Sequence, residues 1–192
     1  GRVWSGKVAN NFGGGSGTKE DPYLIATPEQ LAMLVANVTE TNGEYYKLTH
    51  DIYINDIRKA NWEKNAKQWF WVSTARFGAF TGHFDGNGHM IYGLYLNLKQ
   101  TSDVVYTGLF PTVYASSTIK NLGFSGTSIT VETPIDNESY AGSLTAMMIL
   151  KKSEAETTPA DLAVVSQVFG DRTCHVNAKY AGGIIGGGSY VP

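Results

Sequence analysis

The hydrophobic residues near the N-terminus recur at the spacing of a helix. Thr27 is a good N-cap residue, Pro28 suits the first helical position, and Gln30 lies three residues after the cap. The apolar face that follows consists of Leu31, Leu34, Val35 and Val38. This pattern predicts a one-sided helix, which we expect to cover the end of a β structure where strand edges would otherwise be exposed.

From Tyr45 onward the apolar residues alternate, as in strands that rest on a core. Residues in this pattern are Tyr46, Leu48, Ile52 and Ile54, then Leu94, Leu96 and Leu98, and later Leu122, Phe124, Ile129 and Val131. Glycine, asparagine or aspartate separates these short runs, and no connection of helical length is expected after residue 40. The pattern therefore predicts an all-β fold.

A weak internal repeat indicates how these strands are arranged. Tyr106-Thr107-Gly108-Leu109-Phe110 recurs as Tyr140-Ala141-Gly142-Ser143-Leu144 and as Tyr180-Ala181-Gly182-Gly183-Ile184. The spacings are 34 and 40 residues, which is typical of stacked repeats whose connecting loops differ in length. The repeat predicts a right-handed parallel β-solenoid (β-helix). A β-propeller is the weaker alternative, because each of its blades needs four strands and a firmer period.

These patterns divide the chain into two parts. We expect residues 1–44 to form an N-terminal strand and the capping helix, and residues 45–192 to form solenoid coils. Loop insertions are expected at 56–76 and 150–162, where charged and bulky residues interrupt the alternation. The glycine-rich C-terminal segment has no visible closing element, so we interpret the chain as a fragment of a larger protein.

Composition limits the function classes. Fifteen basic residues stand against 17 acidic ones, and this balance argues against nucleic acid as a partner. The single cysteine, Cys174, excludes an internal disulfide. No run of 18 apolar residues occurs, so we expect no membrane insertion by this segment.

One segment resembles a known family. Residues 77–94, with Gly82, Phe84-Asp85-Gly86, Gly88-His89, Ile91 and Gly93-Leu94, resemble the signature of bacterial cell-surface proteins with GLUG-type repeats. Further similar segments, in the same order, are Gly17–Ile25, Tyr46–Ile52, Gly108–Phe110, Ile119–Leu122 and Gly182–Gly186. The resemblance implies a β-solenoid like those of adhesin-like proteins and of the non-catalytic N-terminal region of IgA-cleaving metalloproteases. It implies no shared ligand, and Pro111, Ser143 and Thr145 depart from the pattern.

Glycine and asparagine mark the expected corners of the coils. Asp85, Gly86, Asn87 and Gly88 form a strong turn signal. Asn121 precedes Leu122 at a second expected corner, where side-chain amides can stack between coils. Gly182 and Gly183 are expected to let backbone approach backbone while the isoleucines that follow fill the core.

Catalytic and metal sites are not indicated. His83, Asp85 and His89 could supply metal ligands, but the resemblance places them in a structural turn. No His-Glu-x-x-His, Gly-x-Ser-x-Gly or Walker motif occurs, and Cys174 and His175 are neighbours that would point to opposite faces of a strand. We therefore predict a non-enzyme without cofactors. A carbohydrate-active β-helix enzyme, with two or three carboxylates on one face, is the alternative.

The insertion at 56–76 is the best binding candidate. Its aromatic residues stand among five basic and two acidic residues, which give a local charge of +3. The candidate ligand-surface residues are Arg58, Trp62, Lys67, Trp69 and Trp71. Exposed rings could stack on sugars while the cations contact acidic groups. In the competing interpretation, Trp69 or Trp71 packs on the first coil.

Together these features predict an extracellular or bacterial cell-surface module for adhesion or display. Its expected partner is a glycan or a host or extracellular protein, and it would be monomeric within a larger chain. A non-catalytic accessory region of a secreted protease is a further alternative.

Overall fold

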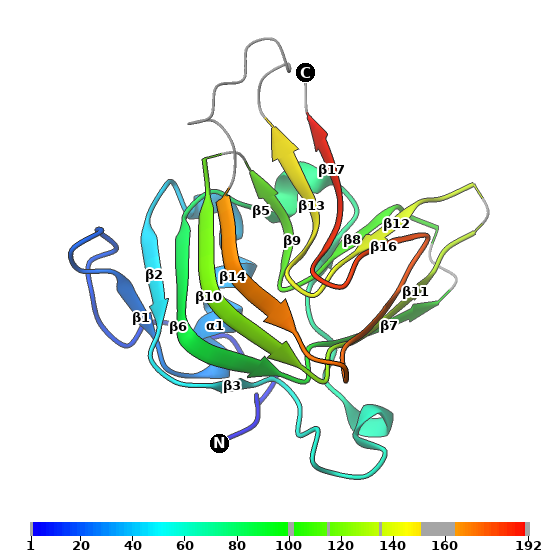
Figure 1. The fold of residues 1–192 in the computed structure, drawn as a ribbon, viewed down its shortest axis with the longest axis horizontal. Coiled ribbons are helices and arrows are strands. Elements are labelled where there is room, and N and C mark those ends of the chain that lie inside the picture. Colours follow the sequence, from blue (N-terminus) through cyan, green and yellow to red (C-terminus); the bar gives the residue numbers. More distant parts are fainter. Residues whose placement is uncertain (1, 100–101, 115, 135, 151–163, 191–192) are drawn as a thin grey trace.

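The structure, a computed structural model, describes residues 2–99, 102–114, 116–134, 136–150 and 164–190 (Figure 1). These residues form four β-sheets, a single α-helix and three short 3-10 helices. Nearly all neighbouring strands are parallel, so the prediction of an all-β fold is confirmed. The expected insertion at 150–162 lies, apart from its first residue, outside the described residues.

The four sheets take their strands from distant parts of the chain. The first sheet contains β1 (Tyr23–Ile25), β2 (Tyr45–Leu48), β3 (Ile52–Tyr53), β6 (His83–Tyr92), β10 (Thr118–Ser125) and β14 (Val164–Gly170). The second contains β7 (Tyr95–Lys99), β11 (Ser128–Glu132) and β15 (His175–Asn177). The third contains β4 (Trp71–Val72), β8 (Val105–Thr107), β12 (Ser139–Ala141) and β16 (Tyr180–Ala181). The fourth contains β5 (Ala79–Phe80), β9 (Phe110–Tyr114), β13 (Thr145–Leu150) and β17 (Ile185–Tyr190).

From β6 onward the chain visits the sheets in a fixed order. It passes from the first sheet to the second, third and fourth, and then returns to the first. We call one such passage a round; the three described rounds comprise β6–β9, β10–β13 and β14–β17. Each strand of a round pairs with the equivalent strands of the rounds next to it, side by side in Figure 1. Among the described strands, the exception to parallel pairing is β4, which runs antiparallel to β8.

The tyrosine repeat predicted from the sequence is confirmed by this pairing. Tyr140 lies opposite both Tyr106 and Tyr180 in the third sheet. The rings stack, with centroids 5.2 Å and 4.8 Å apart and interplanar angles of 4° and 14°. Equivalent positions of the repeat therefore pair with one another in successive rounds, although the connecting segments differ in length.

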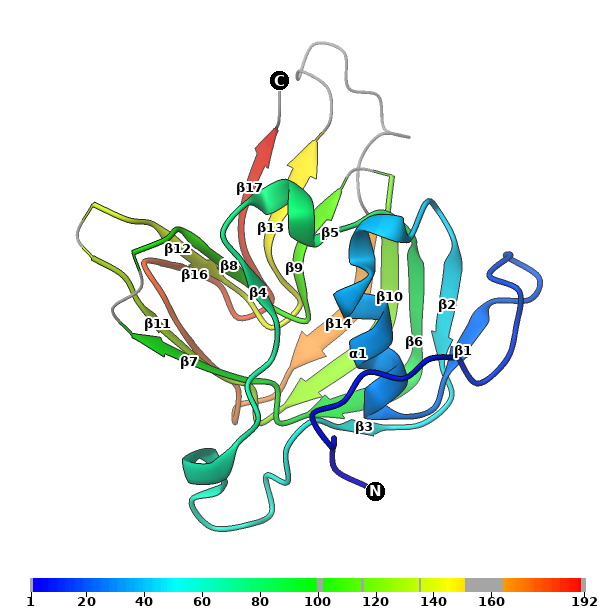
Figure 2. The same ribbon diagram turned by 180° about the vertical axis from the view of Figure 1, so that it is seen from behind.

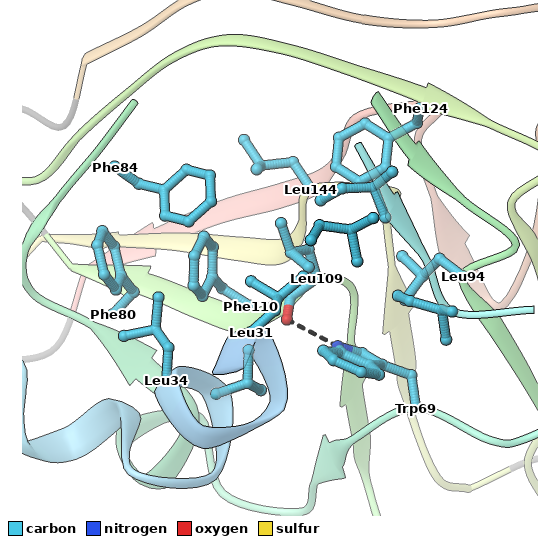
Figure 3. Packing of buried hydrophobic residues seen from close by; sticks show 14 of the residues in the cluster. Leu31, Leu34, Trp69, Phe80, Phe84, Leu94, Leu109, Phe110, Phe124 and Leu144 are labelled. Carbon is cyan, nitrogen blue, oxygen red and sulfur yellow. Dashed lines mark hydrogen bonds between the residues drawn. The ribbon is translucent and has the colours of Figure 1, made fainter. Parts of the chain in front are cut away.

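A large core fills the space between the sheets, and Ala146, Met147 and Ile149 form a second, smaller buried cluster. Its aromatic centre includes Phe80 and Phe110, whose rings stack 4.4 Å apart, with Phe84 edge-on to Phe110 at 5.5 Å (Figure 3). Each of these side chains is almost completely buried. Burial of a phenylalanine or leucine stabilises the fold by about 1.5–3 kcal/mol. The core is therefore the main stabilising element of the described chain.

Helix α1 (Pro28–Ala36) covers one end of the stacked strands (Figure 2). Thr27 caps it as predicted, because its hydroxyl accepts a hydrogen bond from the Gln30 backbone N at 3.2 Å. The Gln30 side chain accepts one from the backbone N of Ala26, the residue before the cap, at 2.8 Å, which ties the preceding chain to the first turn of the helix. Leu31 and Leu34 lie beside the core phenylalanines in Figure 3 and are buried. The short helix η1 (Val38–Glu40) follows it.

The expected turn at Asp85, Gly86, Asn87 and Gly88 is not a chain reversal but a bulge inside β6. Asn87 and Gly88 have φ values of 53° and 77°, and one residue of β10, Asn121, stands opposite the three residues from Gly86 to Gly88. Strands β2 and β3 pair with the two halves of β6 on either side of this bulge. The bulge thus bends the sheet without ending the strand.

Polar side chains connect this corner from round to round. Asn121 has a φ of 57° and donates a hydrogen bond from Nδ2 to Asp85 Oδ1 at 3.3 Å. Asn87 donates from Nδ2 to the Leu48 carbonyl at 3.2 Å. In place of the expected amide stack, Asn121 thus has a carboxylate as its partner in the neighbouring round.

The glycines of the repeat let successive rounds approach closely. A Cβ at Gly142 would lie 2.4 Å from the carbonyl oxygens of both Thr145 and Ile184. At Gly182 it would lie 1.9 Å from Ile185 O, whereas at Gly183 it would meet nothing within 4 Å. The structure therefore requires glycine at the first member of the Gly182-Gly183 pair and not at the second.

Candidate functional site

The N-terminal half of the 56–76 insertion is a loop closed by one buried side chain. Asn55 donates from Nδ2 to the Lys67 carbonyl at 3.0 Å and to the Gly93 carbonyl at 2.8 Å. In return, Lys67 N donates to Asn55 Oδ1 at 2.8 Å. The loop 56–66 projects from the sheets, and at its tip is the short helix η2 (Trp62–Asn65), visible at the lower edge of Figure 1. Asn55 therefore fixes where this loop leaves and rejoins the fold.

Trp69 belongs to the core and not to a ligand surface. Its side chain is 3% exposed, and its ring lies edge-on to those of Trp4 and Phe70, each at 5.0 Å. Its indole Nε1 donates to the Leu109 carbonyl at 3.0 Å, the dashed line in Figure 3. The prediction that Trp69 belongs to a ligand surface is therefore wrong. Burial removes its large apolar ring from water, and this stabilises the fold.

Trp71 also has a structural role. It begins β4, where it pairs with Thr107 of β8, and its ring packs partly buried against the core. After β4 the chain passes through η3 (Ala75–Gly78) into β5. The C-terminal half of the insertion thus runs along the fold, and the competing interpretation of packed tryptophans holds for both Trp69 and Trp71.

Trp62 is the candidate tryptophan that the loop presents at the surface. It is half-buried, with its ring edge-on to Tyr95 at 5.8 Å. It lines two separate open pockets of about 510 Å³ and 470 Å³. Since a large planar ring between two depressions can contact a ligand in either, Trp62 is the centre of the candidate site.

The first depression, here called the lysine pocket, is lined mainly by loop 56–66 and by residues 3–5, here called the N-terminal arm. Its lining residues include Trp4, Asn55, Asp56, Lys59, Asn61, Trp62, Asn65 and Lys67. Lys67 is exposed and its stem lies about 3.5 Å from a Cβ position at Gly6. The predicted candidate Lys67 is therefore in the site together with Trp62.

The second depression, here called the arginine pocket, joins the loop to a corner of the last described round. It is lined by Ile57, Trp62, Glu63, Gly126, Ser128, Arg172, Thr173 and His175. Ile57 packs against Gly126, where an added Cβ would lie 2.7 Å from Ile57 Cγ2. Sequence reasoning missed Arg172 and His175, since more than a hundred residues separate them from Trp62 and no local pattern marks them.

Arg58 lies beside the site with its charge already compensated. Its guanidinium contacts both carboxylate oxygens of Asp56, at 2.7 Å and 3.2 Å, and stands 5.7 Å from the centre of the Tyr53 ring. This hydrogen bond from Arg58 holds the pKa of the Asp56 carboxyl below its ordinary value. Arg58 therefore neutralises Asp56 and is a weaker ligand candidate than the lysines.

The two histidines that could supply metal ligands have other partners in the structure. His83 shares a 2.7 Å hydrogen bond with the Thr118 hydroxyl and stacks on Tyr45 at 4.3 Å. Partial burial lowers the pKa of its imidazole, and nearby Lys19 adds to this effect. His89 contacts Asp51 at 3.1 Å. Within the described residues, no group of three or more histidine, cysteine or acidic side chains is arranged to hold a metal ion.

A third depression, of about 530 Å³, lies near α1. It is lined by residues that include Phe12, Tyr23, Asn37, Glu40, Glu44 and Tyr46. Glu44 accepts a hydrogen bond from the Tyr46 hydroxyl at 3.0 Å, and burial together with this carboxylate raises the pKa of Tyr46 well above its ordinary value. The Glu44 carboxylate of this depression is thus already bound to Tyr46, which packs in an aromatic cluster with Phe12 and Tyr23.

Two curated relatives show which proteins the chain is similar to. It is 36% identical over 129 residues to a protein described as a Gly-rich membrane protein from Evansella cellulosilytica, covering 63% of this chain and 13% of that protein. It is 34% identical over 116 residues to halomucin from Haloquadratum walsbyi, covering 60% of this chain and 1% of halomucin. The chain therefore spans a small part of each relative.

The remaining comparisons give no closer relationship. The sequence matches no protein-family model and no solved structure. Within the described part of the chain, no helix has both the length and the apolar character needed to cross a bilayer.

Proposed function

We propose that this chain is a non-catalytic, right-handed parallel β-solenoid module of an extracellular or cell-surface protein. In this proposal it acts in adhesion or display, and it binds glycan at the Trp62 end of the 56–66 loop. The rounds through the four sheets are the coils of the solenoid, and α1 is its cap. The GLUG-type resemblance stays part of this proposal.

The pairing of equal positions supports the solenoid. Residues 33 to 35 apart lie opposite each other between the first two rounds, as Tyr95 does with Ser128, Tyr106 with Tyr140 and His83 with Thr118. Gly108 and Gly142 both stand where the next round's backbone comes close. Because each round rests on its neighbours, loops between strands can lengthen without disturbing the stack.

The names of the relatives support a surface location. One is described as a Gly-rich membrane protein and the other as halomucin, and each is much longer than the aligned part. A rigid module within a long surface protein is suited to present a loop to the surroundings.

The observation that carries the binding proposal is the position of Trp62. It is half-buried, held by Tyr95, and borders both the lysine pocket and the arginine pocket. Protein sites for sugars combine an aromatic platform with polar groups that fix orientation. Here Asn61 and Asn65 provide amides beside the ring, and Lys59 and Lys67 provide charge.

A glycan array that also carries extracellular-matrix proteins tests the proposal. We expect the 192-residue chain to bind one or more glycans, and Trp62→Ala to abolish that binding while circular dichroism stays unchanged. Phe77→Ala is the matched control, because Phe77 is a 72% exposed aromatic directly after the insertion, in η3, and lines neither pocket. Binding to a matrix protein alone would favour a protein partner, and equal effects of both variants would contradict a site at Trp62.

A further inference from the structure

We infer that the Trp62 site selects acidic glycans, with Arg172 as a contact for a carboxylate or sulfate group. This inference rests on the proposed function and adds the class of ligand. It assigns a binding role to the β14–β15 corner, which the sequence patterns left without one.

The first step is that the two pockets share Trp62. The lysine pocket lies toward the N-terminal arm, and the arginine pocket lies toward the β10–β11 and β14–β15 corners. Since both are bordered by the same ring, a ligand longer than one sugar can cross Trp62 and reach both. Such a ligand meets cations at each end, Lys59 and Lys67 in one pocket and Arg172 in the other.

The second step is that these cations are available. Among the described residues, Lys59, Lys67 and Arg172 form no ion pair within 4.0 Å, and all three are exposed. Asp56, the acid of the lysine pocket, is engaged by Arg58. Glu63 is the acid of the arginine pocket, which Arg172 and His175 also line. The two pockets together therefore offer more positive than negative charge to a ligand.

The third step is that the corner carrying Arg172 is held firmly. Asp171 N donates to Phe124 O at 3.0 Å, and His175 N donates to Thr127 O at 2.7 Å. Gly126 N donates to the Thr173 hydroxyl at 2.8 Å, and Thr173 N donates to Asp171 Oδ1 at 2.9 Å. A guanidinium on a fixed turn loses little backbone freedom when it binds.

The fourth step concerns the chemistry of the guanidinium. Arginine presents planar donors that match the two oxygens of a carboxylate or sulfate, and the resulting charge-assisted bonds are stronger than neutral ones. A neutral sugar would use Trp62 and the asparagines but would leave this guanidinium in water. The arrangement thus favours uronate or sulfated sugars over neutral sugars of the same length.

Calorimetry with matched oligosaccharides tests the inference. We expect uronic-acid and sulfated oligosaccharides to bind at least about tenfold more tightly than a neutral one, because charge-assisted bonds add to stacking. Arg172→Gln and Lys67→Gln should each reduce that advantage by about tenfold, because each should weaken acidic binding much more than neutral binding. Raising the salt concentration should weaken acidic binding alone. Comparing the affinities of the uronic-acid and the sulfated oligosaccharide then shows which of the two anions the site prefers.

Lys120→Gln is the control for charge, because Lys120 is exposed on β10 and lines neither pocket. Equal affinity for neutral and acidic oligosaccharides, with no effect of Arg172→Gln, would overturn the inference and leave the proposed function standing. Failure to bind any glycan would overturn both. An effect of Lys120→Gln as large as that of Arg172→Gln would show general charge attraction and contradict the assigned contact.

Discussion

The side chain of Asn55 holds the backbone of Lys67 from both sides, accepting from its N–H at 2.8 Å and donating to its carbonyl at 3.0 Å. A third bond, to the Gly93 carbonyl, ties this pair to the corner between the first and second sheets. Because Asn55 is 5% exposed, water cannot replace these bonds in the folded state. The mouth of the binding loop is therefore part of the rigid fold.

Removing this side chain should loosen the loop. We expect Asn55→Ala to destabilise the protein by about 1–3 kcal/mol, because the partly buried backbone groups of Lys67 and the buried carbonyl of Gly93 lose their partner. Limited proteolysis should then cut within residues 56–66 faster than in the native chain. Asn65→Ala, an exposed change in the same loop, is the control and should leave both measurements unchanged. Identical behaviour of the two variants would contradict the role of Asn55.

Trp69 and Trp62 should separate stability from binding. Trp69→Ala should lower the free energy of unfolding by about 3–5 kcal/mol, since it leaves a cavity beside Trp4 and Phe70. Trp62→Ala should cost no more than about 1 kcal/mol, because its ring is half-buried. Urea denaturation followed by circular dichroism gives both values. A Trp62→Ala loss as large as that of Trp69→Ala would mean that Trp62 is structural.

The close approach at Gly142 should make it intolerant of a side chain. Gly142→Ala places a Cβ 2.4 Å from the carbonyl oxygens of Thr145 in the same round and Ile184 in the next, so the backbone must shift both within and between rounds. We expect a loss of about 1–3 kcal/mol in the free energy of unfolding. Gly183→Ala, where the Cβ meets nothing within 4 Å, should change it by less than about 0.5 kcal/mol. Thermal denaturation of both variants under the same conditions measures this difference in stability.

Tyr46 should make the protein sensitive to alkali. Burial, with Glu44 beside it, raises the pKa of Tyr46 above the ordinary 10.0, so the folded state keeps the proton while the unfolded state releases it. Above pH 10 the unfolded state binds fewer protons than the folded state, and stability therefore falls as pH rises. Tyr46→Phe should make this fall less steep. Urea denaturation midpoints measured over about pH 8–11 give the slope of stability against pH. An unchanged slope would contradict the assignment.

Features that depend on neighbouring residues were predictable from the sequence. The Thr27 cap acts over three residues, and the structure contains its hydrogen bond with the Gln30 backbone N as expected. The tyrosine-glycine repeat predicted which strands lie beside one another, because a repeated unit forms the same strand in each round. The signal at Asp85–Gly88 indicated a corner, but whether the strand ends there or bends depends on the pairing with β10.

The sequence by itself determined the all-β class, the cap and the spacing of the rounds, since these follow from local capping, alternation and repetition. Only the tertiary structure decided which tryptophan is buried and which is presented: Trp62 and Trp69 stand among similar residues, and their difference arises from the Asn55 closure and the space beside Leu109. It alone also brought Arg172 and His175 to Trp62, because stacking places residues of distant rounds at one corner.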